Sequence, residues 1–534
     1  MSSKRRILIV GGGTAGWLTA CYLAKHLRLA ERPHLEITVL ESPEISVIGV
    51  GEGTFPTIRA TLQTLGIDEW RFVRETSATF KQGIRFVDWA HAPEPAGEGE
   101  TRHQFIHPFE APFYAEDLNL VPYWLLQPEA ERPPFAQAMT LQHRVAAAGR
   151  APKRLSEGAY AAPLNYAYHF DAMKLARLLG EHARQLGVRH VEATLSGVAL
   201  NAGGAIDHIE TLQHGRFEAD LFVDCTGFRA ELIGHLPGKP FRSVRDTLFA
   251  DRAMTCKIAE PSPDAPLESF TIATAHEAGW TWDIGLNGAR GIGCVYSSSH
   301  LSDERAAEIL RQYVGREHAD VAMRRIPFEA GYREQPWVRN CVAIGLSGGF
   351  LEPLESTGLV LIEAAVGMLA EMLPHSGPID APARRFNELM SARYENIINF
   401  LKLHYCLSRR TEPFWQDNLQ AASIPERLAE LLAQWRLRPP GRFDFALDTE
   451  AFAFFNYQYI LYGMGFETQL EAAREDFPQA EQARKLFAKI QRFAERAATD
   501  LPSHRALIQQ IHALAARPAA RAARRPLAAS EPTP

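Results

Sequence analysis

The stretch ILIVGGGTAG, residues 7–16, decides the fold of this chain. Its four leading apolar residues are typical of a buried parallel strand, and apolar side chains at helical spacing follow from Trp17. A second apolar strand at 37–40 then ends on Glu41. A strand, a G-x-G-x-x-G turn, a helix, a second strand and an acid in this order predict the βαβ unit that binds dinucleotides.

The three glycines of this turn have different predicted tasks. Gly11 allows the tight turn, Gly13 lets the backbone approach a pyrophosphate, and Gly16 lets the helix pack on the strand. Amides at the start of the helix would bind the anion, and Glu41 would bind a ribose hydroxyl. The plainer alternatives are a tight turn without a ligand and a solvated acid at the end of a strand.

The composition excludes several classes of protein. With 46% hydrophobic and 22% charged residues, the 534-residue chain is neither disordered nor collagen-like. Its 57 basic and 63 acidic residues give a net charge of −6, so we expect no nucleic-acid partner. The six cysteines form no C-x-x-C pair, which indicates neither a metal site nor a disulfide framework. No apolar run is long enough to span a membrane, so we expect a cytoplasmic protein.

The chain is predicted to divide into three parts. Residues 1–380 form an α/β body, residues 381–515 a mostly helical part, and residues 516–534 a disordered tail. A Pro/Gly/Glu-rich stretch at 92–101 predicts a mobile loop. The other elements that the pattern indicates are a helix at 171–186 with Asp171 as its N-cap and Gly187 as its stop, strands at 221–223 and 341–344, and an aromatic stretch at 452–466.

A second strand–turn–helix unit spans residues 345–359. Its helix is expected to begin near Leu359, so that the amides of Thr357 and Gly358 point outward and can bind an anion or the polar edge of a flavin. Glu355 and Ser356 lie just ahead of this helix. Helix capping alone would explain both residue types, and it is the alternative to a role in chemistry.

Three motifs together resemble the flavin-dependent halogenases, and the tryptophan halogenase branch in particular. They are the glycine turn, the W-x-W-x-I stretch at 280–284 and the F-x-x-P-x-x-S-x-G stretch at 350–358. Further matches in the same order extend the similarity from residue 7 to about residue 415; they are VGEGT at 50–54, FKQGIRF at 80–86, HPF at 107–109, YHFDA at 168–172, DCTGFR at 224–229 and PFW at 413–415.

The resemblance implies an α/β, FAD-binding fold of the glutathione-reductase/hydroxylase type with a helical substrate-binding part. It implies that FADH2, supplied by a separate flavin reductase, and oxygen convert chloride or bromide into hypohalous acid. The oxidant would then reach Lys81, whose amine can hydrogen-bond it or carry the halogen as a haloamine. Glu355 would position the oxidant, stabilise the cationic ring or accept its proton. Without the resemblance, Lys81 would be interpreted as a solvated charge.

The resemblance also assigns binding residues. The halide is expected at the amides of Thr357 and Gly358. The substrate is expected at His107 and Phe109, within wall elements at 103–125, and plain core packing is the alternative for Phe109. The cofactor is expected at Gly11, Gly13, Thr14, Ala15, Gly16, Glu41, Gly51, Val191, Leu346 and Leu359.

Three points stay open: the role of two tryptophans, the turn at Gly285 and the substrate. Trp280 and Trp282 resemble a pair that keeps the substrate away from the flavin; core packing is the alternative, because side chains at i and i+2 lie on one face of a strand. Gly285 stands where the family has a proline, which puts the local turn in question. No residues match those that would grip the charged ends of an amino acid, so free tryptophan, indole and other electron-rich arenes are all open.

Two alternatives to a halogenase are also open. A class A flavin monooxygenase shares the βαβ unit, but it would use NAD(P)H directly and would need no equivalent of Lys81. A non-catalytic FAD-binding sensor or scaffold would hold FAD tightly and show no turnover. The partners expected of a halogenase are a small aromatic substrate and a flavin reductase, and a homodimer is one option for its assembly.

Overall fold

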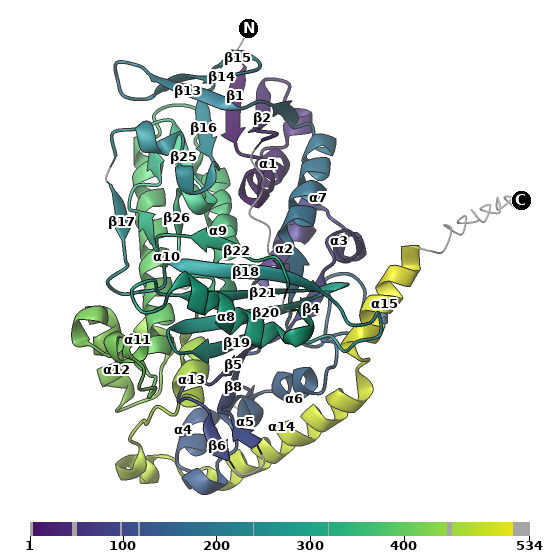
Figure 1. Ribbon diagram of the computed structural model, residues 1–534, viewed down its shortest axis with the longest axis vertical. Helices are drawn as coiled ribbons and strands as arrows, with labels where there is room; N and C mark the ends of the chain where they lie inside the picture. The colour runs from purple at the N-terminus through teal and green to yellow at the C-terminus, as the bar shows by residue number, and fades with distance from the viewer. Residues whose placement is uncertain are drawn as a thin grey trace, which may run out of the picture.

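The computed structural model describes residues 4–44, 51–96, 99–115, 118–238, 240–318, 320–445 and 451–515. The predicted disordered tail at 516–534 lies outside these residues. Two large sheets, one above the other in Figure 1, form the body of the molecule, and helices lie beside both of them.

The predicted βαβ unit is confirmed. β1 (Arg5–Val10) leads into α1 (Thr14–His26) and then into β2 (Leu35–Glu41), which pairs parallel to β1. The complete sheet has the strand order β12-β2-β1-β16-β25-β24, with only β24 antiparallel to its neighbour. The remaining strands are β12 (Arg189–Glu192), β16 (Leu221–Asp224), β25 (Cys341–Ala343) and β24 (Trp337–Val338). This α/β sheet is the fold class that the sequence predicts.

A second sheet of seven strands lies below the first in Figure 1. Its order is β22-β18-β21-β20-β19-β5-β8, and only β19 and β5 pair parallel. The strands are β22 (Arg324–Pro327), β18 (Arg252–Ala259), β21 (Ala289–Tyr296), β20 (Gly279–Leu286), β19 (Phe270–His276), β5 (Gly83–Val87) and β8 (Gln104–Pro108). β20 is buried at every residue, so this sheet is covered on both faces.

Small sheets complete the strands. The one that matters for the site joins β3 (Gly51–Gly53), β11 (Ala167–Asp171) and β4 (Thr79–Lys81), and β3 contacts β20 and β21. The others are β6 (Glu94–Ala96) with β7 (Gly99–Thr101), β9 (Tyr114–Ala115) with β10 (Leu118–Asn119), β13 (Leu195–Leu200) with β14 (Ile206–Thr211) and β15 (Gly215–Phe217), and β17 (Phe241–Ser243) with β23 (Gly331–Arg333) and β26 (Gly349–Phe350).

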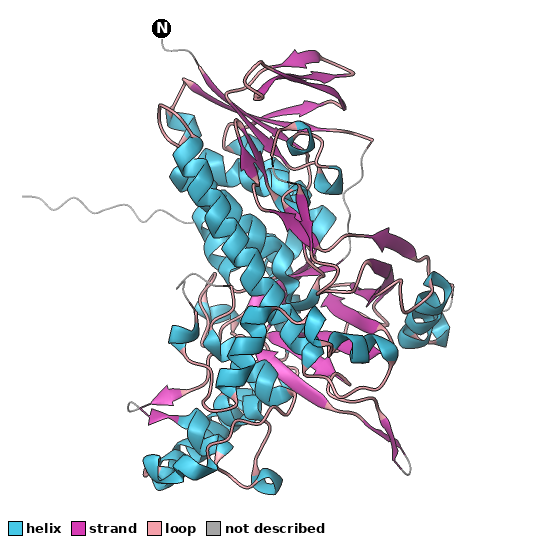
Figure 2. Cartoon of the chain, turned by 90° about the vertical axis from the view of Figure 1, so that its left-hand side faces the viewer, coloured by secondary structure: helices cyan, strands magenta, loops and turns pink. Residues whose placement is uncertain are grey.

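Helices run as a column along the length of the molecule (Figure 2). No helix in the described part of the chain is long and apolar enough to cross a membrane. α1 packs on α7 and α9, and α9 packs on α10. The helices not yet given are α2 (Thr57–Leu65), α3 (Glu69–Glu75), α4 (Leu120–Leu125), α5 (Phe135–Met139), α6 (Gln142–Ala147), α7 (Ala172–Gln185), α8 (Asp303–Val314), α9 (Thr357–Met372), α10 (Asp380–Cys406), α11 (Pro413–Asn418), α12 (Glu426–Trp435), α13 (Phe454–Gly463), α14 (Ala480–Asp500) and α15 (His504–Ala515).

The smaller sequence predictions are mostly confirmed. Asp171 caps α7 by accepting hydrogen bonds from the amides of Met173 and Lys174, and Gly187 beyond its end has φ +93°. The strands predicted at 221–223 and 341–344 are β16 and β25. The prediction of a loop at 92–101 is wrong in part, because β6 (Glu94–Ala96) and β7 (Gly99–Thr101) form an antiparallel pair. Backbone groups can pair in a strand even where the composition is typical of a loop.

We expect Gly16→Val to destabilise the βαβ unit strongly. A Cβ atom at Gly16 would lie 1.8 Å from the carbonyl oxygen of Gly11, so the helix would have to move away from the strand. Such overpacking should cost more than about 3 kcal/mol of folding free energy. Thermal unfolding of the ligand-free protein measures this cost. Gly13→Ala is the control, since its Cβ would meet nothing within 4 Å; equal stability of the two variants would contradict the assignment.

Candidate functional site

A cavity of about 750 Å³ lies where the two large sheets meet α9. It is lined by the turn after β1, the end of β2, β3, the turn after β16 and the start of α9. A volume of this size is typical of small-molecule and cofactor sites. The predicted cofactor residues in its lining are Gly11, Gly13, Thr14, Ala15, Glu41, Gly51, Leu346 and Leu359.

The glycine turn fits a dinucleotide. Gly11 has φ +120°, and a Cβ there would lie 2.2 Å from the carbonyl oxygen of Cys225, so both conformation and space require glycine. Gly13 differs, because its missing Cβ faces open space in the cavity wall. α1 begins at Thr14 with no side-chain cap, so its first amides are available for an anion.

Two predicted cofactor residues lie outside the cavity lining. Val191 packs with Leu8 and Leu40 in the core of the first sheet, and its neighbours Ala193 and Thr194 line the cavity instead. The side chain of Val191 is buried in this core, so a contact between Val191 and a cofactor stays a prediction. Gly16 lies beneath the turn and acts through helix–strand packing, as its predicted task required.

A sharp turn at Glu355 and Ser356 forms the wall at the far end of the cavity. Both residues have positive φ, 64° and 60°. α9 begins directly afterwards at Thr357, two residues earlier than predicted, and no side chain caps it. Gly358 lines the cavity with no atom within 4 Å of an added Cβ, whereas Thr357 is buried. The unpaired amides of this first turn can therefore bind an anion such as a halide.

Lys81 lies behind this wall. Its side chain is fully buried, and Nζ donates a hydrogen bond to Ser356 Oγ at 2.9 Å. Burial lowers the pKa of the Lys81 ammonium to about 7, against the opposing effect of the Glu355 carboxylate. Nζ also lies 5.5 Å from the ring centre of Phe109. The solvated-charge alternative for Lys81 is therefore wrong, and Phe109 faces the ammonium group.

The strand that carries Lys81 is held from three directions. Lys81 pairs with Ala167 of β11. Two residues earlier, the Thr79 hydroxyl donates to the carbonyl oxygen of Gly285 at 2.6 Å. Between them, the Phe80 amide donates to His504 Nε2 of α15 at 2.9 Å. Gly285, which accepts the bond from Thr79, lies within β20 and pairs with Arg290. The strand continues through this position, so there is no turn where the family has its proline.

Glu355 makes two hydrogen bonds through one oxygen. His107 Nδ1 lies 2.8 Å and His404 Nε2 lies 3.1 Å from Glu355 Oε1. Burial alone would raise the pKa of the Glu355 carboxyl, but the two imidazoles outweigh it and lower the pKa to about 2. The capping alternative is wrong, because the carboxylate contacts histidines and not the amides of α9.

His107 is held on both sides. Besides its bond to Glu355, its Nε2 lies 3.0 Å from Oδ1 of Asn456 on α13. The ring is 5% exposed and lies 6.0 Å from the ring of Tyr459. The structure thus brings Lys81, Glu355, His107 and Phe109 into one region behind the cavity. A carboxylate, an amine and aromatic rings in this arrangement can bind and protonate or deprotonate an aromatic molecule.

The two tryptophans of the W-x-W stretch have different neighbours. Trp282 lines the cavity, and the indole N–H groups of both tryptophans lack a hydrogen-bond partner among the described residues. Trp280 is 1% exposed and lies 6.2 Å from the ring of Trp89, in the core. Core packing therefore describes both tryptophans, and Trp282 lines the cavity in addition.

Three residues of the site escaped the sequence analysis as site residues. Ser356 contacts Lys81, Thr271 lines the cavity, and His404 contacts Glu355. Ser356 lies inside the F-x-x-P-x-x-S-x-G stretch, so the motif carried a signal for it. Thr271 and His404 lie in ordinary strand and helix sequence, and only the tertiary fold brings them to the site.

Comparison with known proteins agrees with this geometry. The tryptophan halogenase family model matches residues 6–477. Tryptophan 6-halogenase SttH of Streptomyces toxytricini is 35% identical over 482 residues, 86% of this chain and 89% of its own length. The crystal structure of a tryptophan halogenase from Shewanella frigidimarina has a TM-score of 0.89 and 39% identity, covering 96% of this chain and 98% of its own. Tar14, a tryptophan C-6 flavin-dependent halogenase from taromycin biosynthesis, has a TM-score of 0.87 and 35% identity, covering 95% of this chain and all of its own. The chain therefore belongs to the tryptophan halogenase family and is a flavin-dependent halogenase.

Proposed function

We propose that this enzyme uses reduced FAD from a separate reductase, oxygen and chloride or bromide to halogenate an electron-rich arene such as indole or tryptophan. The relatives SttH and Tar14 are named for tryptophan, which makes an indole ring the first candidate. The observation that carries the proposal is the buried amine of Lys81, which donates a hydrogen bond to Ser356 in the lining of the cofactor-sized cavity.

The cavity supports FAD as the cofactor. The glycine turn would hold the pyrophosphate, Glu41 the ribose, and Leu346 and Leu359 the flavin end. When bound, the reduced flavin with oxygen would supply the oxidising power that converts halide into hypohalous acid. The amides at the start of α9, at Thr357 and Gly358, would hold the halide at the end of the cavity next to the wall.

On the other side of the wall, the chain's own residues would act on the oxidant and the arene. Near neutral pH, Lys81 is partly an uncharged amine, so it can hydrogen-bond hypohalous acid or take the halogen as a haloamine. The Glu355 carboxylate would stabilise the cationic ring and accept its proton. His107 and Phe109 would contact the ring, where aromatic stacking contributes about 0.5–1.5 kcal/mol beyond burial.

Family membership favours halogenation over a class A monooxygenase or a flavin-binding scaffold. A panel of arenes that includes indole and tryptophan, incubated with regenerated FADH2 and either halide, tests the proposal by mass spectrometry. Halogenated product supports it. Direct NADPH oxidation without a reductase, or tightly held FAD without turnover, would overturn it.

The proposed cytoplasmic location is supported by six unpaired cysteines, which suit a reducing compartment.

We predict that Lys81→Met removes halogenated product and leaves oxidation of reduced flavin intact, because Lys81 lies outside the cavity lining. The expected fall in product formation is roughly 10²–10⁴-fold. Methionine keeps the volume of the buried chain, so thermal unfolding should change little. Lys402→Met is the matched control, since Lys402 is also buried but bonds Asn418 and the Thr247 carbonyl. Product at the parental rate in Lys81→Met would remove Lys81 from the mechanism.

We predict that Glu355→Gln loses about 2.7–4 kcal/mol of transition-state stabilisation, roughly 10²–10³ in rate. The substitution preserves shape and removes the negative charge that would face the cationic ring. Turnover at saturating halide and FAD affinity are the measurements, and affinity should stay near the parental value. Glu363→Gln serves as the control, because Glu363 lies on the same helix but bonds Thr57 and Thr61. Near-parental turnover of Glu355→Gln would contradict the catalytic role.

We predict that Gly13→Val weakens FAD binding by at least about tenfold without lowering the stability of the ligand-free protein. With φ −78° and no atom within 4 Å of its Cβ, this position accepts a side chain, but the side chain would fill the space of the pyrophosphate. Fluorescence titration gives the affinity and thermal unfolding gives the stability. Unchanged affinity would show that the turn does not bind the cofactor.

A further inference from the structure

The hydrogen bonds of His404 require an extra proton in the pair that it forms with Glu355. His404 Nδ1 lies 2.8 Å from the carbonyl oxygen of Phe400, which can only accept, so Nδ1 carries hydrogen. Its other nitrogen, Nε2, lies 3.1 Å from Glu355 Oε1. A neutral imidazole has only one N–H, and an ionised carboxylate has none. The Glu355–His404 pair must therefore hold one proton more than a carboxylate and a neutral imidazole.

The contacts around the pair place this proton on the imidazole. Glu355 Oε1 faces a second ring nitrogen, His107 Nδ1, at 2.8 Å, and two N–H donors on one oxygen favour a carboxylate there. A buried carboxylate without an opposite charge is costly, and an imidazolium in direct contact supplies that charge. The rings of Phe86 and Phe400, both 5.1 Å from the His404 ring centre, offer aromatic surfaces to a cation.

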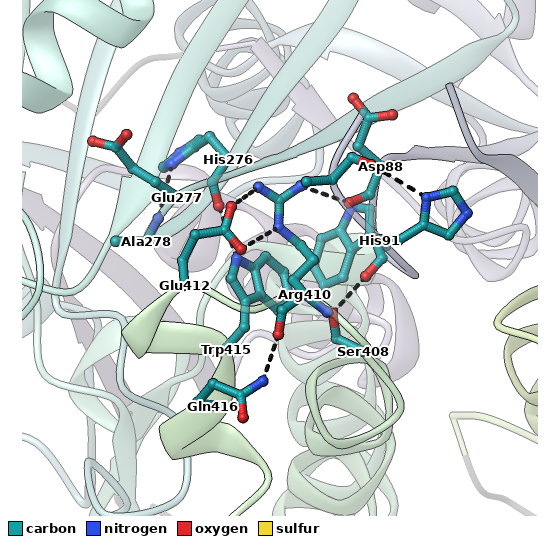
Figure 3. A network of polar contacts seen from close by, with 12 residues as sticks. Asp88, His91, His276, Glu277, Ala278, Ser408, Arg410, Glu412, Trp415 and Gln416 are labelled. Atoms are coloured by element: carbon teal, nitrogen blue, oxygen red, sulfur yellow. Dashed lines mark hydrogen bonds and ion pairs between the residues drawn. The ribbon is translucent and has the colours of Figure 1, made fainter. Parts of the chain in front are cut away.

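The segment that follows His404 is fastened to the body of the protein. Figure 3 shows Arg410 between Asp88 and Glu412, where its guanidinium donates to the Asp88 carbonyl oxygen at 2.9 Å. Ser408 donates to the Trp89 carbonyl oxygen at 2.7 Å. The Trp89 ring in turn lies 6.0 Å from the His404 ring. These contacts fix the end of α10, and with it the direction in which His404 meets Glu355.

We propose that His404 is a positioning residue, held as an imidazolium, that keeps Glu355 ionised and occupies Oε1 so that Oε2 is left to accept the ring proton. Oε2 has no hydrogen-bond partner among the described residues. In that step the C–H bond at the halogenated carbon breaks, its electron pair restores the aromatic ring, and the proton goes to Oε2. This proposal rests on the proposed halogenase function.

The pH dependence of His404→Gln tests the proposal. Glutamine can still donate to Glu355 but carries no charge, so the pKa of Glu355 should rise and its carboxylate should be lost as the pH falls. The ratio of variant to parental turnover should therefore fall as the pH falls. The other titratable groups that face Glu355 are Lys81 and His107, which both proteins retain, so their effects largely cancel in the ratio. A lower ratio that is the same at every pH would show a merely structural role and overturn the proposal.

A measurement without flavin or substrate separates this proposal from the function on which it rests. In the ligand-free, ¹⁵N-histidine-labelled protein, NMR should show a doubly protonated imidazole at about pH 8 that is absent in both His404→Gln and Glu355→Gln. Only neutral histidines in the parental spectrum would overturn the proposal, whatever the activity. A parental protein that shows the signal but halogenates no arene would instead overturn the proposed function. If neither variant folds, the parental spectrum alone decides.

Discussion

The site depends on one sharp turn, in which two consecutive non-glycine residues have positive φ. Glu355 and Ser356 each adopt a conformation that costs of order 1–3 kcal/mol for an ordinary side chain. The surrounding structure holds them there, because Lys81 bonds Ser356 and two histidines bond Glu355. The turn also sets where α9 begins and forms the end of the cavity. This one strained segment thus lies between the cofactor side and the substrate side of the site. It lines the cavity through Ser356 and bonds Lys81 and the two histidines on the other side.

Burial has opposite results for the two reactive groups on the far side of this turn. Lys81 has a hydroxyl group as its hydrogen-bond partner, so desolvation dominates and its pKa falls to about 7. Glu355 has two imidazole partners, which outweigh desolvation and bring its pKa to about 2. Near neutral pH the amine is therefore partly uncharged while the carboxylate stays ionised. Although both groups are buried, their different hydrogen-bond partners allow the Lys81 amine to react with an electrophile and the Glu355 carboxylate to stabilise a cation.

Much of the fold follows from local sequence, and much of the site does not. The βαβ unit was predictable, because its glycines meet steric demands within a few residues, such as the contact of Gly16 with Gly11. Lys81 and Glu355 were found only through the resemblance, since a lone lysine or glutamate has no local signature. His404 and Asn456 come from helices far along the chain, and nothing in their own sequence predicts contact with Glu355 or His107. The pairing of β6 with β7 was missed because composition indicated a loop.

The W-x-W stretch shows why a packing interpretation and a functional one need not exclude each other. Trp282 faces the cavity, while Trp280 packs on Trp89. Trp89 also contacts His404, so Trp280 supports, through one intervening ring, the histidine that bonds Glu355. A strand places both tryptophans on one face. Because that face extends from the cavity to the core behind Glu355, one residue can shape the cofactor side while the other stabilises the position of the carboxylate.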